Sequence, residues 1–300
     1  MLISLIVCTR NRCSSLRTCL EYVKRLESPG DWELIIVDNA STDRTGDLLK
    51  TFVENIPFGV RLVFEPKPGL GRARNAGVAK ASGEIIAFTD DDCYVSSDFL
   101  IRILEVFRDA KIGFMGGRVL LYDETDVPQT IRPETEVGLI PPQSFVRPGQ
   151  LQGANMAARR SLVTEVGGFD PDFGAGSTFR SCEETDFQAR ASEAGATGIY
   201  HPGPLVWHHH GRKRGEGYKK LMNAYYYGCG AYYAKFILNP QTRSRFLKNW
   251  YWSARNRLRD HEPLAILKEL AGAYAYILLK LRRLGKALDR VEEPTRMASL

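Results

Sequence analysis

The sequence predicts an α/β protein in which a mostly parallel sheet is flanked by helices. Four short apolar runs begin near residues 2, 34, 60 and 84, and each has the length and aliphatic content of a buried parallel strand. A segment with apolar residues at helical spacing follows each run, which is the pattern of repeated strand–helix–strand units. The 300 residues are 44% hydrophobic and 25% charged, so the chain can bury a substantial core and is not a mainly disordered protein.

The first part of the chain supplies these elements in order. The four expected strands are Leu2–Val7, Leu34–Val37, Val60–Phe64 and Glu84–Thr89. The helices that should cross between and after them are expected around Leu16–Leu26 and Leu48–Phe52, and over Gly71–Ala81 and Asp98–Phe107.

The cysteines and the first residues of the chain indicate in which cellular compartment the protein is expected. Six cysteines are scattered along the chain without a CxxC pair, which argues against both a disulfide framework and a structural zinc site. The chain runs from Met1 directly into a strand-like segment, so a secretory signal is not expected. We therefore expect a cytoplasmic protein.

Charge divides the chain into two parts. Residues 212–300 hold 19 Lys and Arg against 7 Asp and Glu, whereas residues 1–211 hold 22 against 28. We therefore expect a catalytic domain over 1–211 and a basic, amphipathic helical extension over 212–300. Such a basic extension is typical of a surface that meets an anionic partner.

Apolar and aromatic residues at helical spacing predict three helices in this extension, over 218–237, over 246–258 and from Pro263 onward. Only ten uncharged residues run from Leu270 to Leu279, too few to cross a bilayer. Aromatic residues beside Lys and Arg favour peripheral contact with an anionic membrane, on the inner face of the cytoplasmic membrane. The alternative is packing within the protein or against a second subunit, and no nucleic-acid partner is expected.

Polar and acidic residues follow three of the strands, at 9–11, 38–41 and 90–92. Ligands of open α/β sheets bind outside the carboxyl ends of the strands. Asp90, Asp91 and Asp92 place three carboxylates together without a cation beside them in the sequence, and Mg²⁺ or Mn²⁺ would relieve their repulsion. The alternative is a solvated acidic turn, or Asp92 as the cap of the next helix. No GxxxxGK[ST] phosphate loop is present.

Six ordered blocks resemble the family 2 glycosyltransferases, which have the GT-A fold. The resemblance covers roughly residues 1–211, with a donor half over about 1–120 and an acceptor half over about 121–211. Phe88–Asp92 resembles the DxD motif. The other blocks are Val7–Arg12, Ile36–Asp43, Gly71–Gly77, Gly153–Ala157 with Val166–Asp170, and Glu183–Phe187.

The resemblance implies a metal-dependent, inverting transfer of a sugar from a nucleoside-diphosphate sugar to an acceptor hydroxyl, in polysaccharide or lipid-linked glycan assembly. It implies that Asp38 binds the base or ribose, that Asp90 lies on the ribose side, and that Asp92 holds the Mn²⁺ or Mg²⁺ ion. A helix cap is the alternative for Asp38. The implied donor-binding residues are Thr9, Arg10, Asn11, Asp38, Arg74, Asp90 and Asp91, and the implied acceptor-side residues are Gly153, Ala154 and Asn155.

Arg74 and His208 complete this set. The resemblance places Arg74 near the diphosphate, and a surface cation is the alternative. His208 follows the strand-like segment Pro204–Val206 and, with Asp90 and Asp92, is an expected metal ligand. A solvated or backbone-bonded histidine is the alternative, and in a strand His208 and His210 would share one face.

A second acidic cluster begins a helix and supplies the expected catalytic base. Glu184 stands where the family usually has aspartate, and Glu183 and Asp186 are its rivals. A helix N-terminus favours the ionised carboxylate, which can accept the proton of an acceptor hydroxyl. Acidic residues that only stabilise the first helical turn are the alternative.

Two other functions fit parts of the pattern. A sugar nucleotidyltransferase also uses an α/β sheet with acidic metal ligands, but the segment Thr9–Cys13 lacks the glycine-rich loop expected after the first strand. A non-catalytic, membrane-associated adaptor with a GT-A fold is the second alternative, and the presence of Asp90, Asp92 and Glu184 argues against it.

Overall fold

The computed structural model describes the backbone of residues 1–27, 30–56 and 58–297, and side chains as far as residue 286. Two compact units result. Unit 1 comprises Met1–Thr178 and Cys182–Lys219, and unit 2 comprises Phe179–Ser181 and Lys220–Leu300. The division falls after Lys219 instead of after residue 211, because the main chain of Val127 bonds to that of Arg212 and the Tyr218 hydroxyl donates to Gln129.

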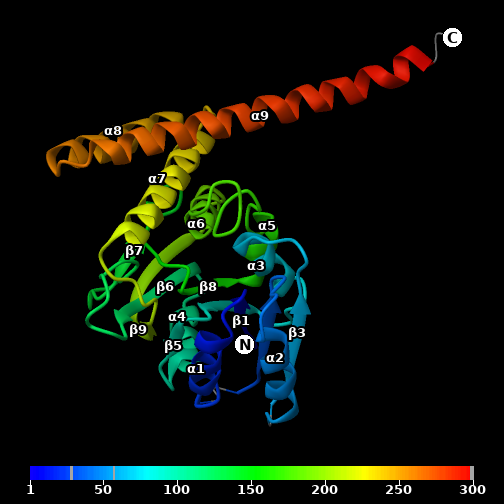
Figure 1. Cartoon of the computed structure of the whole chain (residues 1–300), viewed down its shortest axis with the longest axis vertical. Helices are drawn as coiled ribbons and strands as arrows, with labels where there is room; N and C mark the ends of the chain where they lie inside the picture. Colours follow the sequence, from blue (N-terminus) through cyan, green and yellow to red (C-terminus); the bar gives the residue numbers. More distant parts are fainter. Residues whose placement is uncertain (28–29, 57, 298–300) are drawn as a thin grey trace. The chain divides into compact units, whose positions relative to one another are not determined.

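The four expected strands form the parallel half of the sheet in unit 1. They are β1 (Ile3–Thr9), β2 (Trp32–Asp38), β3 (Val60–Phe64) and β4 (Ile85–Asp90), in the spatial order β3-β2-β1-β4. β1 and β3 are labelled in Figure 1. Every side chain of β1 is buried, which explains its unbroken apolar run. Because all four strands point the same way, Thr9, Asp38 and Asp90 lie at one edge of the sheet.

Helices cross between these strands as expected. They are α1 (Cys13–Val23), α2 (Thr45–Glu54), α3 (Leu70–Val78) and α4 (Phe99–Phe107). α3 lies close on β1 and β2, since a Cβ on Gly77 would stand 2.7 Å from Ile6 and 3.1 Å from Val37. A larger residue at Gly77 would push this helix, which carries Arg74, away from the sheet.

Beyond β4 the sheet is mixed instead of parallel. β8 (Asn155–Arg159) pairs antiparallel with β4 and with β6 (Ile112–Leu121), while β9 (Thr197–His208) runs parallel to β6. β5 (Cys93–Val95) and β7 (Gly138–Ile140) each pair antiparallel with β9. Two further helices, α5 (Arg160–Glu165) and α6 (Glu183–Glu193), belong to this half.

The expected helices of the basic extension are α7 (Glu216–Ile237), α8 (Arg243–Arg259) and α9 (Pro263–Met297). In unit 2, Phe236 of α7 stacks on Phe246 of α8 with centroids 4.5 Å apart. Glu269 of α9 is buried, where it accepts a hydrogen bond from Trp250 (2.8 Å) and pairs with Arg257 (2.9 Å). Among the described residues, none of the helices combines the length and the hydropathy needed to cross a bilayer.

Candidate functional site

The acidic segment after β4 is a buried, paired cluster. Asp91 and Asp92 are 6% and 4% exposed, and Asp92 precedes β5, so a solvated turn or a cap on α4 is excluded. Thr9 Oγ1 donates to Asp91 Oδ2 at 2.7 Å, and Arg12 lies 3.7 Å from Asp91 and forms an ion pair with Asp92. The cation missing from the local sequence therefore comes from the loop after β1.

This environment shifts the pKa values of the Asp91 and Asp92 carboxylates in opposite directions. Burial raises the pKa of Asp91 to about 7, against the opposing effect of Arg12 and the Thr9 hydrogen bond. Burial also acts on Asp92, but His208 and Arg12 outweigh it and hold the pKa of Asp92 below its usual range. Asp92 is therefore the carboxylate that stays ionised beside a basic partner.

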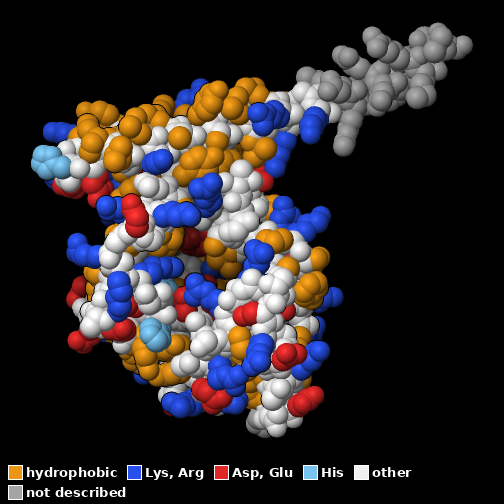
Figure 2. Space-filling view, in the orientation of Figure 1, with side chains coloured by type: hydrophobic (Ala, Val, Ile, Leu, Met, Phe, Trp, Pro, Cys, Tyr) orange, Lys and Arg blue, Asp and Glu red, His pale blue; other side chains and the backbone are white. Residues whose placement is uncertain are grey.

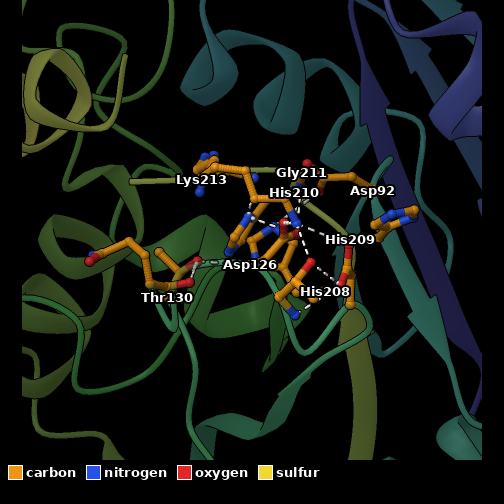
Figure 3. Close-up of polar contacts among 12 residues, drawn as sticks. Asp92, Asp126, Thr130, His208, His209, His210, Gly211 and Lys213 are labelled. Atoms are coloured by element: carbon orange, nitrogen blue, oxygen red, sulfur yellow. Dashed lines mark hydrogen bonds and ion pairs between the residues drawn. The ribbon is translucent and has the colours of Figure 1, made fainter. Parts of the chain in front are cut away.

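A group of three side chains could hold a metal ion. Ligand atoms of Asp92, Cys93 and His208 all lie within 4.8 Å of one another. His208 Nε2 is 3.3 Å from Asp92 Oδ1, and its Nδ1 is 3.1 Å from Thr130 Oγ1 (Figure 3). Carboxylate oxygen and imidazole nitrogen suit Mn²⁺ or Mg²⁺ better than a thiol does, so Asp92 and His208 are the ligands that fit.

Asp90, which was expected to bind both donor and metal, lies with a different partner. Its Oδ1 is 3.3 Å from Arg74 Nη2, and its side chain is 30% exposed. The structure thus brings Asp92 and His208 together and places Asp90 toward the Arg74 side of the same edge.

Arg74 is buried and contacts several acceptors, so it is not a surface cation. Its side chain is 2% exposed, its Nη1 is 3.0 Å from Glu183 Oε1, and its Nη2 also donates to the carbonyl of Gly153 at 3.3 Å. The guanidinium lies over the rings of Phe88 and Phe169. Arg74 therefore ties the end of β4 to the start of α6, because one planar fork can bind several acceptors at fixed angles.

The three acidic residues at the start of α6 have different surroundings. Glu183 is 6% exposed and paired with Arg74. Glu184 is half-buried, and burial together with the neighbouring Glu183 carboxylate raises its pKa to about 8. Glu184 thus combines partial access to solvent with a pKa suited to proton transfer near neutral pH, whereas Glu183 and Asp186 are buried.

Asp186, the third candidate base, is held inside the protein. Its side chain is fully buried, and its Oδ2 is 2.8 Å from Arg190 Nε. Arg190 in turn donates to the carbonyls of Val166 and Gly168. This pair fixes the Val166–Gly168 turn to α6.

We expect Asp186→Asn to act on stability more than on chemistry. Removing one partner of a buried ion pair costs about 3–5 kcal/mol, so the free energy of unfolding should fall by about that amount in urea titrations. Glu165→Gln, on an exposed acid, is the matched control and should change it by less than about 0.5 kcal/mol. A turnover loss of about 10²-fold without lost stability would restore Asp186 as a candidate base.

The loops after β1 and β2 are tied together at the same edge. Asn11 donates its N–H to Ser41 Oγ at 3.0 Å and accepts from the N–H of Thr42 at 2.7 Å. Asp38 accepts the N–H of Ser41 at 2.9 Å, whereas α2 begins only at Thr45, so Asp38 does not cap that helix. Arg10 is exposed.

Asn39 belongs to the polar segment 38–41 expected at this edge of the sheet, but no role was assigned to it from the sequence. Its amide donates to the carbonyls of Glu65 (3.0 Å) and Lys67 (2.8 Å), and its Oδ1 accepts the N–H of Gly69 at 2.8 Å. These bonds hold the connection from β3 to α3. The only sequence signal was its place directly after Asp38 at the end of a strand.

The acceptor-side segment lies against Arg74. A Cβ on Gly153 would stand 2.7 Å from Arg74 Nη2, so a larger residue would displace the guanidinium. Ala154 is buried. Asn155 is turned into the sheet, where its amide donates to the carbonyls of Arg118 and Pro204, both at 2.9 Å. Of these three residues, Gly153 is in contact with the charged cluster.

The segment after His208 is anchored by residues that were also not identified from the sequence. Asp126 accepts the N–H of Gly211 at 2.8 Å and pairs with Lys213 at 2.6 Å (Figure 3). His209 points the other way, with its Nδ1 2.9 Å from the Tyr94 hydroxyl. The rings of His208 and His210 lie 4.9 Å apart, as expected for alternate residues. These contacts fix the main chain directly after His208 and so help to fix the position of that histidine.

Comparison with known proteins gives one family. A sequence model described as glycosyl transferase family 2 matches residues 4–167. AglE of Haloferax volcanii is 25% identical over 56% of this chain and 55% of its own length. TuaG of Bacillus subtilis, whose name refers to teichuronic acid biosynthesis, is 31% identical over 46% of this chain and 60% of its own length. The chain spans a third to about half of the length of two other curated relatives. It covers 34% of the length of alr2836 from Nostoc and 50% of the length of YdaM from Bacillus subtilis.

Solved structures agree on the fold. The mannosyltransferase PcManGT of Pyrobaculum calidifontis, in complex with GDP-Man and Mn²⁺, superposes with a TM-score of 0.64 at 22% identity, over 95% of this chain and 79% of that one. TarS of S. aureus in complex with UDP-GlcNAc gives a TM-score of 0.57 at 17% identity, over 82% and 69%. The GT-A fold is confirmed.

Proposed function

Because this chain belongs to glycosyl transferase family 2, we propose that it transfers a sugar from a nucleoside-diphosphate sugar to an acceptor hydroxyl, with a divalent metal and with inversion at the anomeric carbon. One observation carries the proposal. The carboxylates after β4 meet His208 on one side and, through Arg74, the acidic start of α6 on the other.

Asp92 and His208 would hold Mn²⁺ or Mg²⁺. The ion would supply a Lewis acid for the diphosphate leaving group. Arg12 lies on the same carboxylate and places a second positive charge at this point. Asn11 and Asp38 lie at the ends of neighbouring strands, which suits them to the nucleoside of the donor. Thr9 is buried and its hydroxyl donates to Asp91, so its expected role in donor binding would be to position that carboxylate.

Glu184 is the base of this proposal. The acceptor oxygen attacks the anomeric carbon, the bond from that carbon to the diphosphate oxygen breaks, and the hydroxyl proton passes to the Glu184 carboxylate. Glu183 is occupied by Arg74 and Asp186 by Arg190. Glu183 and Arg74 therefore position the start of α6 relative to Asp90.

The donor and acceptor are proposed by class. The neighbouring structures hold GDP-Man and UDP-GlcNAc, so guanosine- and uridine-diphosphate sugars are the first donors to test. The name of TuaG supports a polysaccharide or lipid-linked glycan as acceptor. All six cysteines are free thiols, and the cytoplasmic location expected from the sequence stays a prediction.

The proposal is tested by nucleoside-diphosphate release from a panel of sugar nucleotides, with Mn²⁺ and with EDTA. We expect slow, Mn²⁺-dependent release from one donor that a glycan acceptor accelerates. Inversion is tested by NMR of the product's anomeric proton. Pyrophosphate release from a nucleoside triphosphate and a sugar phosphate would instead support the nucleotidyltransferase alternative. Binding of no nucleotide would support the non-catalytic adaptor.

A further inference from the structure

α9 carries a second apolar face besides the one that packs in unit 2. Its buried positions, among them Ala265, Glu269, Gly272 and Tyr276, follow helical spacing on one side. A different row is between 37% and 68% exposed, and its members also recur every three or four residues. This exposed row consists of Leu264, Leu267, Leu270, Tyr274, Ile277, Leu281 and Leu284.

α8 repeats the arrangement. Leu247, Tyr251 and Leu258 are 46%, 62% and 58% exposed, and their spacing places them on one side of the helix. Trp252 is 45% exposed, with the Arg255 guanidinium 5.0 Å from its ring. Hydrophobic side chains therefore lie along both helices beside Lys and Arg, as Figure 2 shows.

Cations border both apolar rows. On α8, Lys248, Arg255 and Arg259 form a row next to the apolar one. Lys248 and Arg259 each follow a member of the apolar row by one residue, and Arg255 lies two helical turns after Lys248. On α9, Lys268, Arg282 and Lys286 lie along one edge of the exposed row and Lys280 along the other. We call these exposed apolar rows and their bordering cations the α8–α9 face.

Over residues 220–286, acidic groups offset only a small part of the charge of this face, and Arg259 is the bordering cation with an acidic neighbour, Asp260. Residues 220–286 hold thirteen Lys and Arg against three Asp and Glu. Glu269 is buried against Arg257 and Trp250, Glu262 is 3.4 Å from Arg257, and Asp260 is 3.3 Å from Arg259. The net positive charge of the face is therefore exposed beside its apolar side chains.

We propose that the α8–α9 face binds the surface of an anionic phospholipid bilayer, with both helices lying in the plane of the headgroups. A bilayer surface offers an apolar layer for the leucine rows and phosphate groups for the bordering cations, which are the two requirements of this face. Anionic lipid also strengthens binding by about a factor of five for each cation near the surface. This inference is independent of the proposed catalytic function.

Other occupants match only part of the face. A nucleic acid backbone would satisfy the cations but offers no apolar layer for the leucine rows. A second copy related by a two-fold axis would bring the same cationic rows toward each other, which costs free energy without anionic partners between them.

The test is sedimentation of the full chain with vesicles of phosphatidylcholine alone or mixed with phosphatidylglycerol. We expect binding to the mixed vesicles that weakens as salt rises from about 0.1 M to 1 M, because the Debye length falls from about 10 Å to about 3 Å. Equal binding to both vesicle types, or no binding to either, would overturn the proposal.

Two sets of substitutions separate the charged and apolar contributions. Lys248, Arg255 and Arg259 changed together to Gln should lower the partition coefficient by about 10²-fold. Arg257 is left intact because it pairs with the buried Glu269 of α9. Leu267, Leu270 and Tyr274 changed together to Ser should lower binding as strongly, including at high salt.

The matched control is Lys50, Lys80 and Lys111 changed together to Gln, which removes the same charge from exposed positions of unit 1. It should leave the partition coefficient within about twofold. Far-ultraviolet circular dichroism checks that the variants stay folded. A face variant that keeps vesicle binding but loses a dimer in light scattering, or loses only binding to duplex DNA, would overturn the proposal in favour of that partner.

Discussion

Glu184→Gln should leave donor binding intact and lower turnover by about 10²–10⁴-fold, which is the usual contribution of a general base. The amide keeps the size of the side chain but cannot take a proton from the acceptor hydroxyl. The measurement is kcat for nucleoside-diphosphate release in the presence of acceptor, together with the donor Kd from calorimetry. An unchanged Kd with a reduced kcat is the signature of a base that contributes only to the chemical step.

The pH profile adds a second readout. A base acts in its deprotonated form, and burial with the Glu183 carboxylate raises the pKa of Glu184 to about 8. The value of kcat/KM should therefore rise with pH and reach half of its plateau near pH 8. This rise should disappear in Glu184→Gln.

Glu183→Gln is the matched comparison, one residue away. Its loss of charge weakens the pairing with Arg74, so we expect lower stability and a smaller loss of turnover that keeps the dependence on pH. If Glu183→Gln abolishes the pH-dependent limb and Glu184→Gln does not, the roles of the two residues are reversed.

The parallel half of the fold was predictable because its signal is local. Each buried strand needs consecutive apolar residues, and the expected strands at 2–7 and 84–89 agree closely with β1 and β4. The insertion of β8 between β4 and β6 was not predicted. Strand pairing depends on which faces are covered by elements far along the chain, and no local pattern carries that information.

The candidate site was predictable in its acidic residues and less so in their partners. Asp92 and His208 were expected to lie together and do so. Arg74 was expected to lie near the diphosphate or at the surface, but its partner Glu183 is 109 residues away and buries it. Arg12 likewise reaches Asp92 across 80 residues. Ion pairs between residues so far apart in the sequence form only after the sheet has brought the ends of its strands together.

The second large effect is expected at Asp92. Asp92→Asn should abolish the Mn²⁺-dependent part of nucleotide binding and lower turnover by about 10³-fold or more, since a Lewis acid at the leaving group supplies several kcal/mol of transition-state stabilisation. The amide retains the shape of the side chain beside His208 and Arg12 but carries no charge to offset the ion. The measurement is calorimetric titration of GDP and UDP with and without Mn²⁺.

His208→Gln should lower the Mn²⁺-dependent affinity in the same direction, because it removes the imidazole 3.3 Å from Asp92. Asp109→Asn makes the same chemical change at an exposed position and should leave the titration unaltered. Cation binding also stabilises the folded state, by an amount that grows with the logarithm of its affinity. Mn²⁺ should therefore raise the Tm of the wild-type chain and of Asp109→Asn but not that of Asp92→Asn. Equal Mn²⁺-dependent affinity in Asp92→Asn and the wild type would show that the ion is held elsewhere, and the assignment of Asp92 would then be wrong.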